Sequence, residues 1–258
     1  MASQEKVAYL EEKAKQLRKM ALTMIYTAQS GHPGGSFSAA DIVAALYFDE
    51  LRLDPQNPRW ADRDRFVLSK GHVCPIQYSA LQGHPDMKRC PGIDISTGSL
   101  GQGVSCAAGM AIGLKQAGSP GRVFCLVGDG ESCEGQVWEA MSAAAKYQLD
   151  NLVVFVDSNG LQNDGSCQDI MPTQDLREKF AAFGCQTYAI NGHRMEEIVD
   201  VLEAIRSDRS GKPVAVIAKT VKGKGVSFME NVVKWHGVAP NDAEYAQAMA
   251  ELERGLAG

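Results

Sequence analysis

Apolar residues recur at three- and four-residue steps along the first thirty positions, at Val7, Leu10, Ala14, Leu17, Ala21 and Met24. This spacing predicts an amphipathic helix, which Gly31 and Pro33 end. The loop SGHPGGSF follows. The capping-box spacing of Ser38 and Asp41 predicts that a second helix starts there and continues through Tyr47.

From about residue 60 to 104 the chain is rich in Gly, Pro and Ser without a clear period, which predicts a long irregular and functional segment. Beyond it, helix-like and strand-like patterns alternate. Helices are predicted at 102–117, 134–147, 175–183 and 195–206, and strands at 122–127, 152–156, 186–190 and 213–219. This alternation predicts an α/β fold, with a mainly parallel sheet flanked by helices on both faces, in a single domain over residues 1–258. Ligands of such folds bind at the carboxyl ends of the strands.

Composition and charge narrow the class of protein. Hydrophobic residues make up 45% and charged residues 22% of the 258 positions, which is typical of a soluble globular protein, and no apolar run approaches the roughly 18 residues of a membrane helix. A net charge of −5 without a long Lys/Arg block argues against a nucleic-acid partner. Seven widely spaced cysteines indicate reduced thiols, and the charged N-terminus lacks a signal peptide, so we expect a cytoplasmic protein without membrane contact.

One acidic residue stands between two glycines after the apolar stretch FCLV, in Gly128-Asp129-Gly130. In isolation this triplet is typical of a tight turn. The next strand ends in Asp157-Ser158-Asn159, and neighbouring parallel strands bring their carboxyl ends to the same edge of a sheet. Asp129 and Asn159 both offer oxygen atoms, which suit a hard divalent cation such as Mg²⁺ or Ca²⁺ that is shared with a phosphate. Gly130 offers a backbone N–H to an anion near a helix start.

The segment DISTGSLGQG is rich in glycine and precedes a helix of small residues. It is a poor dinucleotide fingerprint, because no strand clearly precedes it and no acidic residue is placed to bind a ribose. Its bare backbone suits close contact with a flat heterocycle instead.

Four of the five histidines follow a glycine, far more than 26 glycines in 258 residues predict by chance: His32, His72, His84 and His193. A single histidine is more commonly structural than catalytic. Imidazoles gathered in loops, however, suit acid/base chemistry and phosphate binding near neutral pH. We interpret His193, which precedes a predicted helix, as structural.

Together these segments resemble the N-terminal, diphosphate-binding part of transketolase. The resemblance spans nearly the whole chain, in SGHPGGSFSAADI, FVLSKGHVCP, GHPDMKRCPGIDISTGSLGQG, GDGESCEGQVWEA, DSNGLQNDG, KTVKGKGVSFME and WHG. The Gly-Asp-Gly to Asn spacing is general among thiamine diphosphate enzymes, whereas the other segments are far more specific. The resemblance implies a thiamine diphosphate-binding fold of the diphosphate (PP) type, with thiamine diphosphate and Mg²⁺ (or Ca²⁺) as cofactors. It also implies transfer of a two-carbon ketol unit from a ketose phosphate to an aldose phosphate, as in the pentose phosphate pathway.

The resemblance further implies roles for single residues. The metal ligands are Asp129, Asn159 and the main-chain carbonyl of Leu161. The cofactor-facing residues are Gly130 at the diphosphate, His72, Lys222 and His236 chiefly near it, and Gly98, Ser99 and Leu100 on the pyrimidine side. The residues that face the substrate and the thiazolium ring are His32 and His84, and Glu134 and Glu139 match glutamates that link active sites across a subunit interface.

Two departures from the family pattern affect this interpretation. Ser158 replaces the first of two usual asparagines, which keeps the metal ligand and leaves the role of that first amide in question. Full-length transketolases also carry a pyrimidine-binding domain, with the glutamate that protonates the aminopyrimidine, and a C-terminal domain. We expect these domains on a partner chain, in an α2β2 assembly that binds sugar phosphates.

Two alternatives stay open at this point. A component of a deoxyxylulose phosphate synthase-like or 2-oxo acid decarboxylating enzyme shares Gly-Asp-Gly and the asparagine, although GHPDM, GSLGQG and WHG favour transketolase. A non-catalytic cofactor-binding module is the other alternative. His32, His84 and Lys222 argue against it, because a simple binding module has no need of histidines that face the substrate.

Overall fold

A five-stranded parallel sheet forms the centre of the computed structural model, which describes residues 2–77, 86–88 and 92–254. The strands are β1 (Arg65–Leu68), β2 (Val123–Gly128), β3 (Leu152–Ser158), β4 (Gln186–Asn191) and β5 (Val214–Lys219). They lie in the order β1-β2-β3-β5-β4, and each pairs in parallel with its neighbours. The predicted parallel α/β fold is confirmed.

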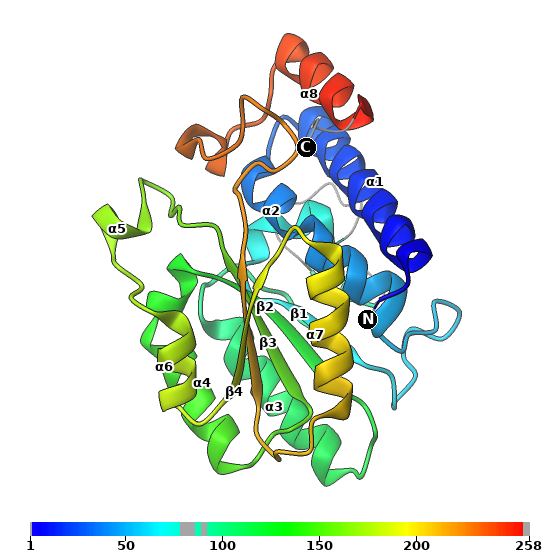
Figure 1. Cartoon of the computed structure of the whole chain (residues 1–258), viewed down its shortest axis with the longest axis vertical. Helices are drawn as coiled ribbons and strands as arrows, with labels where there is room; N and C mark the ends of the chain where they lie inside the picture. Colours follow the sequence, from blue (N-terminus) through cyan, green and yellow to red (C-terminus); the bar gives the residue numbers. More distant parts are fainter. Residues whose placement is uncertain (1, 78–85, 89–91, 255–258) are drawn as a thin grey trace.

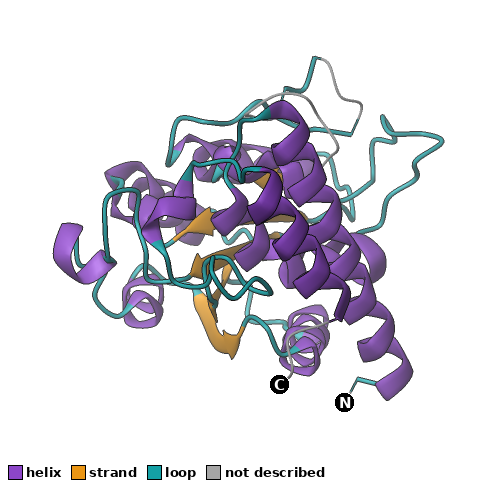
Figure 2. Ribbon diagram, turned by 90° about the horizontal axis from the view of Figure 1, so that it is seen from above, coloured by secondary structure: helices purple, strands orange, loops and turns teal. Residues whose placement is uncertain are grey.

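Helices connect the strands and cover both faces of the sheet. The α-helices are α1 (Gln4–Ala28), α2 (Pro33–Ala45), α3 (Gln102–Gln116), α4 (Gly135–Lys146), α5 (Cys167–Ile170), α6 (Leu176–Ala182), α7 (Met195–Ser207) and α8 (Asp242–Arg254). The shorter helical turns are a π-helical turn η1 (Leu46–Glu50) and the 3₁₀ turns η2 (Gly71–Ile76), η3 (Gly130–Cys133) and η4 (Val233–His236). Figure 1 shows the sheet between α4 and α6 on one side and α7 on the other, and Figure 2 shows the strands enclosed by helices when seen from above.

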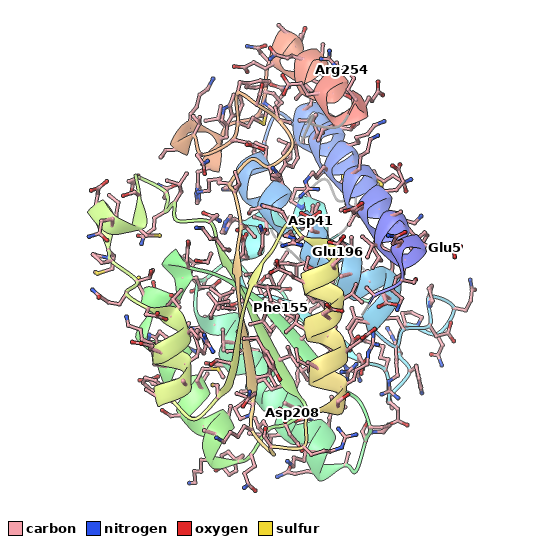
Figure 3. All side chains as sticks on the ribbon, in the orientation of Figure 1. Glu5, Asp41, Phe155, Glu196, Asp208 and Arg254 are labelled. Carbon is pink, nitrogen blue, oxygen red and sulfur yellow. The ribbon has the colours of Figure 1, made fainter. Side chains whose placement is uncertain are left out.

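Alternate residues of each strand supply two separate cores. On β3, Phe155, labelled in Figure 3, packs with α1, α2 and α7, whereas Val154 and Val156 pack with α3, α4 and α6. Both faces of the central strands are therefore apolar, and β2, β3 and β5 are nearly continuous hydrophobic runs, as expected where a parallel sheet has two covered faces. The edge strand β4 is only partly buried. No helix among residues 2–77, 86–88 and 92–254 is long and apolar enough to cross a membrane.

The predicted start of the second helix was wrong. Helix α2 begins at Pro33, which occupies the first turn and lacks the N–H that a helix interior needs. Ser38 lies inside the helix, where its hydroxyl donates to the Asp157 carboxylate at 2.6 Å instead of capping a helix end. All residues of α2 are buried, so the helix has no polar face whose edge would mark its start.

The segment predicted to be irregular contains β1 and η2. The strand is only four residues long and pairs with β2 at the edge of the sheet. It delivers Ser69, Lys70 and His72 to the carboxyl edge of the sheet, beside the ends of β2 and β3. This edge is where the predicted site residues converge.

Candidate functional site

A cavity of about 470 Å³ opens at the carboxyl ends of the strands. It is lined by loops that follow β1, β2, β3 and β5 and by the segment before α3: Gly35, Lys70, His72, Gly98, Leu100, Gly128, Asp129, Gly130, Glu131, Cys133, Glu134, Asn159, Leu161, Gln162, Asn163, Met171, Lys222 and His236. The cavity is where ligands of doubly wound folds bind, and it brings together most of the residues that the sequence singled out.

The turns after β2 and β3 meet at the Asp129 carboxylate. Asp129 is buried, and its two oxygens accept the backbone N–H groups of Gly130 at 2.7 Å and of Gly160 at 2.6 Å. The Asn159 side-chain oxygen accepts the N–H of Leu161 at 3.1 Å. Burial raises the pKa of Asp129, and the two backbone hydrogen bonds partly counter that rise. The three predicted metal ligands therefore lie on one pair of joined turns.

Lys222 follows β5 and is buried in the cavity wall. Its ammonium donates to the Leu161 carbonyl at 3.1 Å and to His236 Nδ1 at 2.8 Å. Burial lowers the pKa of Lys222 to about 8, with a further decrease from the Lys70 charge, while Asp129 acts in the opposite direction. A bound anion in the cavity would favour the charged ammonium. The site therefore holds a cation beside the predicted metal position, where a diphosphate needs one.

Three imidazole rings pack together at the cavity. The rings of His72 and His236 stack with centroids 5.2 Å apart, and His32 packs edge-on against them at 5.1 and 5.6 Å. Burial and the Lys222 charge lower the pKa of His236 to about 3, and burial and the Lys70 charge hold the pKa of His72 well below its usual range. His72 and His236 are neutral at physiological pH, so each offers one donor and one acceptor nitrogen.

A buried ion pair supports the floor of the cavity. Lys70 donates to the Asp157 carboxylate, which also accepts from the hydroxyls of Ser38, at 2.6 Å, and Thr220. Burial alone would raise the pKa of Asp157, but the Lys70 charge and these hydrogen bonds lower it. The sequence pattern gives no sign of this group, because its members lie on four separate elements and belong to no recognisable spacing.

The glycine-rich segment before α3 forms one wall of the cavity. Its contact with the pyrimidine ring stays a prediction. Gly98 and Leu100 line the cavity, and Ser99 lies between them. Gly101 has φ +81°, a conformation that favours glycine, and its N–H donates to the buried carboxylate of Glu131 at 2.9 Å. Sequence reasoning missed Glu131, although it follows Gly-Asp-Gly directly.

The remaining predicted residues differ in their relation to the cavity. Glu134 lines it, whereas Glu139 lies on α4 and is not among the lining residues. His193 bonds to Asp41 through Nδ1 at 2.7 Å and accepts the Val221 N–H at 2.8 Å through Nε2, which agrees with a structural role. His84 lies outside the described residues.

The residues at the cavity fit a metal-bound diphosphate. One carboxylate, one amide and one main-chain carbonyl form a set of hard oxygen donors, and Lys222 supplies positive charge. An added Cβ on Gly130 would lie 2.9 Å from the Gln162 side chain, so a larger residue there would displace Gln162 from the cavity wall. Among the described residues no group of three or more His, Cys, Asp or Glu is placed to hold a metal ion.

Comparison with known proteins identifies similar sequences. The family described as the transketolase thiamine diphosphate-binding domain matches residues 10–83 and 79–253. The chain is 41% identical to the 6-deoxy-6-sulfo-D-fructose transketolase subunit SqwG of Clostridium sp. (strain MSTE9), over 95% of this chain and 96% of that protein. It is 37% identical to an apulose-4-phosphate transketolase subunit of Phocaeicola vulgatus, over 95% of this chain and 94% of that one.

Full-length transketolases match over only part of their length. Human transketolase is 40% identical over 91% of this chain, which spans 40% of the human protein. The crystal structure of transketolase from Campylobacter jejuni superposes with a TM-score of 0.89 and 33% identity, over 98% of this chain and 43% of that one. The chain thus spans about two fifths of the length of these two proteins and nearly the whole length of the two subunits.

Proposed function

This chain belongs to the transketolase family as its N-terminal, thiamine diphosphate-binding part, and we propose that it holds the metal–diphosphate end of that cofactor for ketol transfer from a ketose phosphate to an aldose phosphate. The single observation that carries this proposal is the junction of the β2 and β3 turns at Asp129, with the Lys222 ammonium beside it. It supports a cation site and an anion site in one cavity at the carboxyl edge of the sheet.

In this proposal the joined turns after β2 and β3 hold both the metal and the diphosphate. Asp129, Asn159 and the Leu161 carbonyl bind Mg²⁺, or Ca²⁺ in its place, and supply one full negative charge. Gly130, whose N–H donates to Asp129, lies at the start of a helical turn and has no side chain, which leaves room for the diphosphate beside the metal. Lys222, which donates to the Leu161 carbonyl, neutralises the diphosphate beside the metal, so the cofactor is fixed by both its charge and its metal.

In this proposal His32 and His84 act on the substrate side, and His72 and His236 lie on the cofactor side. When bound, thiamine diphosphate would supply the nucleophilic carbon that holds the two-carbon ketol unit between breakage of the ketose carbon–carbon bond next to the carbonyl and formation of the new bond to the aldose. His32 and His84 exchange protons with the substrate hydroxyl and carbonyl oxygens, while His72 and His236, which are neutral, donate or accept hydrogen bonds without adding charge. Gly98, Ser99 and Leu100 present backbone to the pyrimidine ring.

The pyrimidine-binding and C-terminal domains come from a partner chain in this proposal. The two relatives described above that match over nearly their whole length are both named as subunits. Leu100 and Met171 line the cavity and are 39% and 55% exposed, so apolar surface is available where a partner would close the site. We place residues 1–258 in one domain and in a cytoplasmic α2β2 assembly.

Two other functions are compatible with the sequence pattern alone. The relatives' names favour a transketolase over a deoxyxylulose phosphate synthase-like or 2-oxo acid decarboxylating component. The packing of His32 against His72 and His236 favours a catalytic subunit over a simple cofactor-binding module. A role in the pentose phosphate pathway stays a prediction, because the two subunit relatives are named for other sugars.

The direct test combines the purified chain with a candidate partner that carries the pyrimidine-binding and C-terminal domains. Ketol transfer from a ketose phosphate to an aldose phosphate is measured with thiamine diphosphate and Mg²⁺. We expect activity from the mixture and none from either chain alone. Robust transfer by this chain alone would overturn the two-chain arrangement, and a mixture that fails to bind thiamine diphosphate would overturn the cofactor site.

A further inference from the structure

The Glu131 carboxylate is fully engaged by three donors from three separate segments. Its Oε1 accepts the hydroxyl of Ser69 and the backbone N–H of Gly101, the latter at 2.9 Å. Its Oε2 accepts the backbone N–H of Gly128 at 3.1 Å. The residue is 3% exposed although it lines the cavity, so it is buried within the wall.

The three donors belong to the main parts of the proposed cofactor site. Gly128 ends β2 immediately before Asp129, and Ser69 follows β1 immediately before Lys70. Gly101 ends the segment of Gly98 to Leu100 and precedes α3. Glu131 itself lies in the turn that begins with Gly130, so one carboxylate joins the diphosphate side of the cavity to its pyrimidine side.

Packing explains why this junction is specific. An added Cβ on Gly103 would collide with the backbone and side chain of Ser69, so the first turn of α3 lies directly on the segment after β1. An added Cβ on Gly101 would lie 3.0 Å from Glu134 Cβ, so Gly101 also packs closely against Glu134. The segment before α3 therefore contacts the end of the sheet through close backbone packing and through Glu131.

A role as a proton donor does not fit this geometry. Both oxygens of Glu131 already accept hydrogen bonds, and the carboxylate is the form that these three donors stabilise. Burial raises the pKa of Glu131, and the Ser69, Gly101 and Gly128 hydrogen bonds and the Lys70 charge counter that rise. The group is better suited to hold other atoms in place than to react.

We propose that Glu131 is a positioning residue that fixes the Gly98–Gly101 segment to the diphosphate turn, so that the two ends of the cofactor are held at one separation. This inference rests on the proposed function of the cavity. A cofactor that is anchored by its diphosphate needs the wall that contacts its pyrimidine ring to lie at a defined distance from that anchor. A hydrogen bond to a buried charge fixes the backbone N–H of Gly101 more strongly than a bond between neutral groups would.

The first test measures the junction without any cofactor. Amide hydrogen exchange of the full chain is compared for wild type, Glu131→Ala and Glu131→Gln, with Glu178→Ala on exposed α6 as the control. We expect exchange at Gly101 and Gly128 to rise in Glu131→Ala, by about tenfold or more at Gly101, while the amides of 123–127 in β2 and those of β3 keep wild-type protection. The side-chain amide oxygen in Glu131→Gln replaces one of the two carboxylate acceptors. The exchange rate at Gly101 in this variant should therefore lie between those of wild type and Glu131→Ala.

The second test separates this inference from the proposed function. Calorimetry on the assembled complex compares thiamine diphosphate with inorganic diphosphate, each with Mg²⁺. We expect Glu131→Ala to weaken thiamine diphosphate binding about tenfold or more and to leave diphosphate binding within about threefold, with partial recovery in Glu131→Gln. Equal loss for both ligands, or wild-type exchange at Gly101 in Glu131→Ala, overturns the positioning role. A wild-type complex that binds neither ligand overturns the proposed function instead, whatever the exchange data show.

Discussion

The Asp129 carboxylate accepts the Gly160 N–H at 2.6 Å and so joins the turn after β2 to the turn after β3. The same carboxylate accepts the N–H of Gly130 at 2.7 Å. Two strand ends are thereby held together by one charged group before any ligand is considered. The donors of the proposed metal site are preorganised, which lowers the conformational cost of binding a cation.

Replacing Asp129 with Asn should abolish metal-dependent cofactor binding and leave the fold intact. The amide keeps one acceptor for the backbone N–H groups but loses the charge that a divalent cation needs. We expect at least about a 100-fold loss of thiamine diphosphate affinity in the presence of Mg²⁺, and a loss of about 10- to 100-fold for Asn159→Ala. Calorimetry on the assembled complex measures both effects.

Thermal unfolding of the same variants provides the control. Asp129→Ala leaves two N–H groups without this acceptor and should cost about 1–3 kcal/mol of stability, whereas Asp129→Asn should cost less. If both Asp129→Asn and Asn159→Ala bound the cofactor as wild type does, the metal site would lie elsewhere.

Lys222 and Lys224 provide a matched pair for the diphosphate site. Lys222 is buried and donates to the Leu161 carbonyl, whereas Lys224 is two residues further along and pairs with Glu230 at 3.4 Å. We expect Lys222→Met to lower the affinity for inorganic diphosphate with Mg²⁺ by about tenfold or more, because a charged hydrogen bond to the anion is lost. Lys224→Met should bind as wild type. Equal affinities in the two variants would remove Lys222 from the diphosphate site.

Sequence pattern predicted the fold well where burial alternates with exposure. The helices α1, α4 and α7 have one buried face and were placed within a few residues. Helix α2 is buried on every side, so its apolar and small residues show no period, and the Ser38–Asp41 spacing suggested a false start. Strand β1 lies beside polar loops and has only four residues, which are too few to show a distinct pattern of hydrophobic positions.

Some residues of the candidate site were likewise predictable from the sequence, and others were not. Asp129 and Asn159 follow neighbouring strands, so the parallel arrangement alone predicts that they meet. Glu131 depends on donors 62 and 30 residues away, at Ser69 and Gly101, and a contact of that kind is set by tertiary packing and leaves no spacing in the sequence. The pairing of Lys70 with Asp157 was missed for the same reason, since 87 residues separate the two.

The buried carboxylate of Asp41, labelled in Figure 3, should make the free energy of unfolding depend on pH in the acid range. Burial acts to raise its pKa, but the charges and hydrogen bonds of Arg18 and His193 lower it from 3.8 to about 2. Because the folded-state pKa is below the unfolded value, the stabilisation is complete above about pH 4 and is lost as the pH falls towards 2. The contribution corresponds to about 2 kcal/mol.

Urea unfolding across this pH range tests the effect of Asp41. The difference in unfolding free energy between wild type and Asp41→Asn should shrink by about 2 kcal/mol as the pH falls through the window. Asp54→Asn alters an exposed acidic residue, so its unfolding free energy should change with pH as that of wild type does. A constant difference between wild type and Asp41→Asn would show that the buried pair with Arg18 does not govern acid stability.

The apolar rim of the cavity should bind the partner chain. Leu100 and Met171 line the cavity and are substantially exposed, and Ile170 beside them is 47% exposed. The Met171 carbonyl accepts from the Gln162 side chain at 2.9 Å, so the rim is attached to the turn that carries the proposed metal ligands. Burying each apolar side chain at an interface contributes about 1.5–3 kcal/mol, or roughly a tenfold or greater change in affinity.

We therefore expect Leu100→Asp and Met171→Asp each to weaken association with the partner about tenfold or more, measured by analytical ultracentrifugation of mixtures with thiamine diphosphate and Mg²⁺. Tyr147→Asp is the matched control: Tyr147 is 52% exposed, but it follows the end of α4 that is remote from the cavity. Because α4 rises about 1.5 Å per residue, its twelve residues place that end some 18 Å from Glu134 at the cavity. The control should associate as wild type does. Wild-type association of both rim variants would place the partner on another surface, and an equal loss in Tyr147→Asp would indicate a general effect of the added charge rather than a contact at the rim.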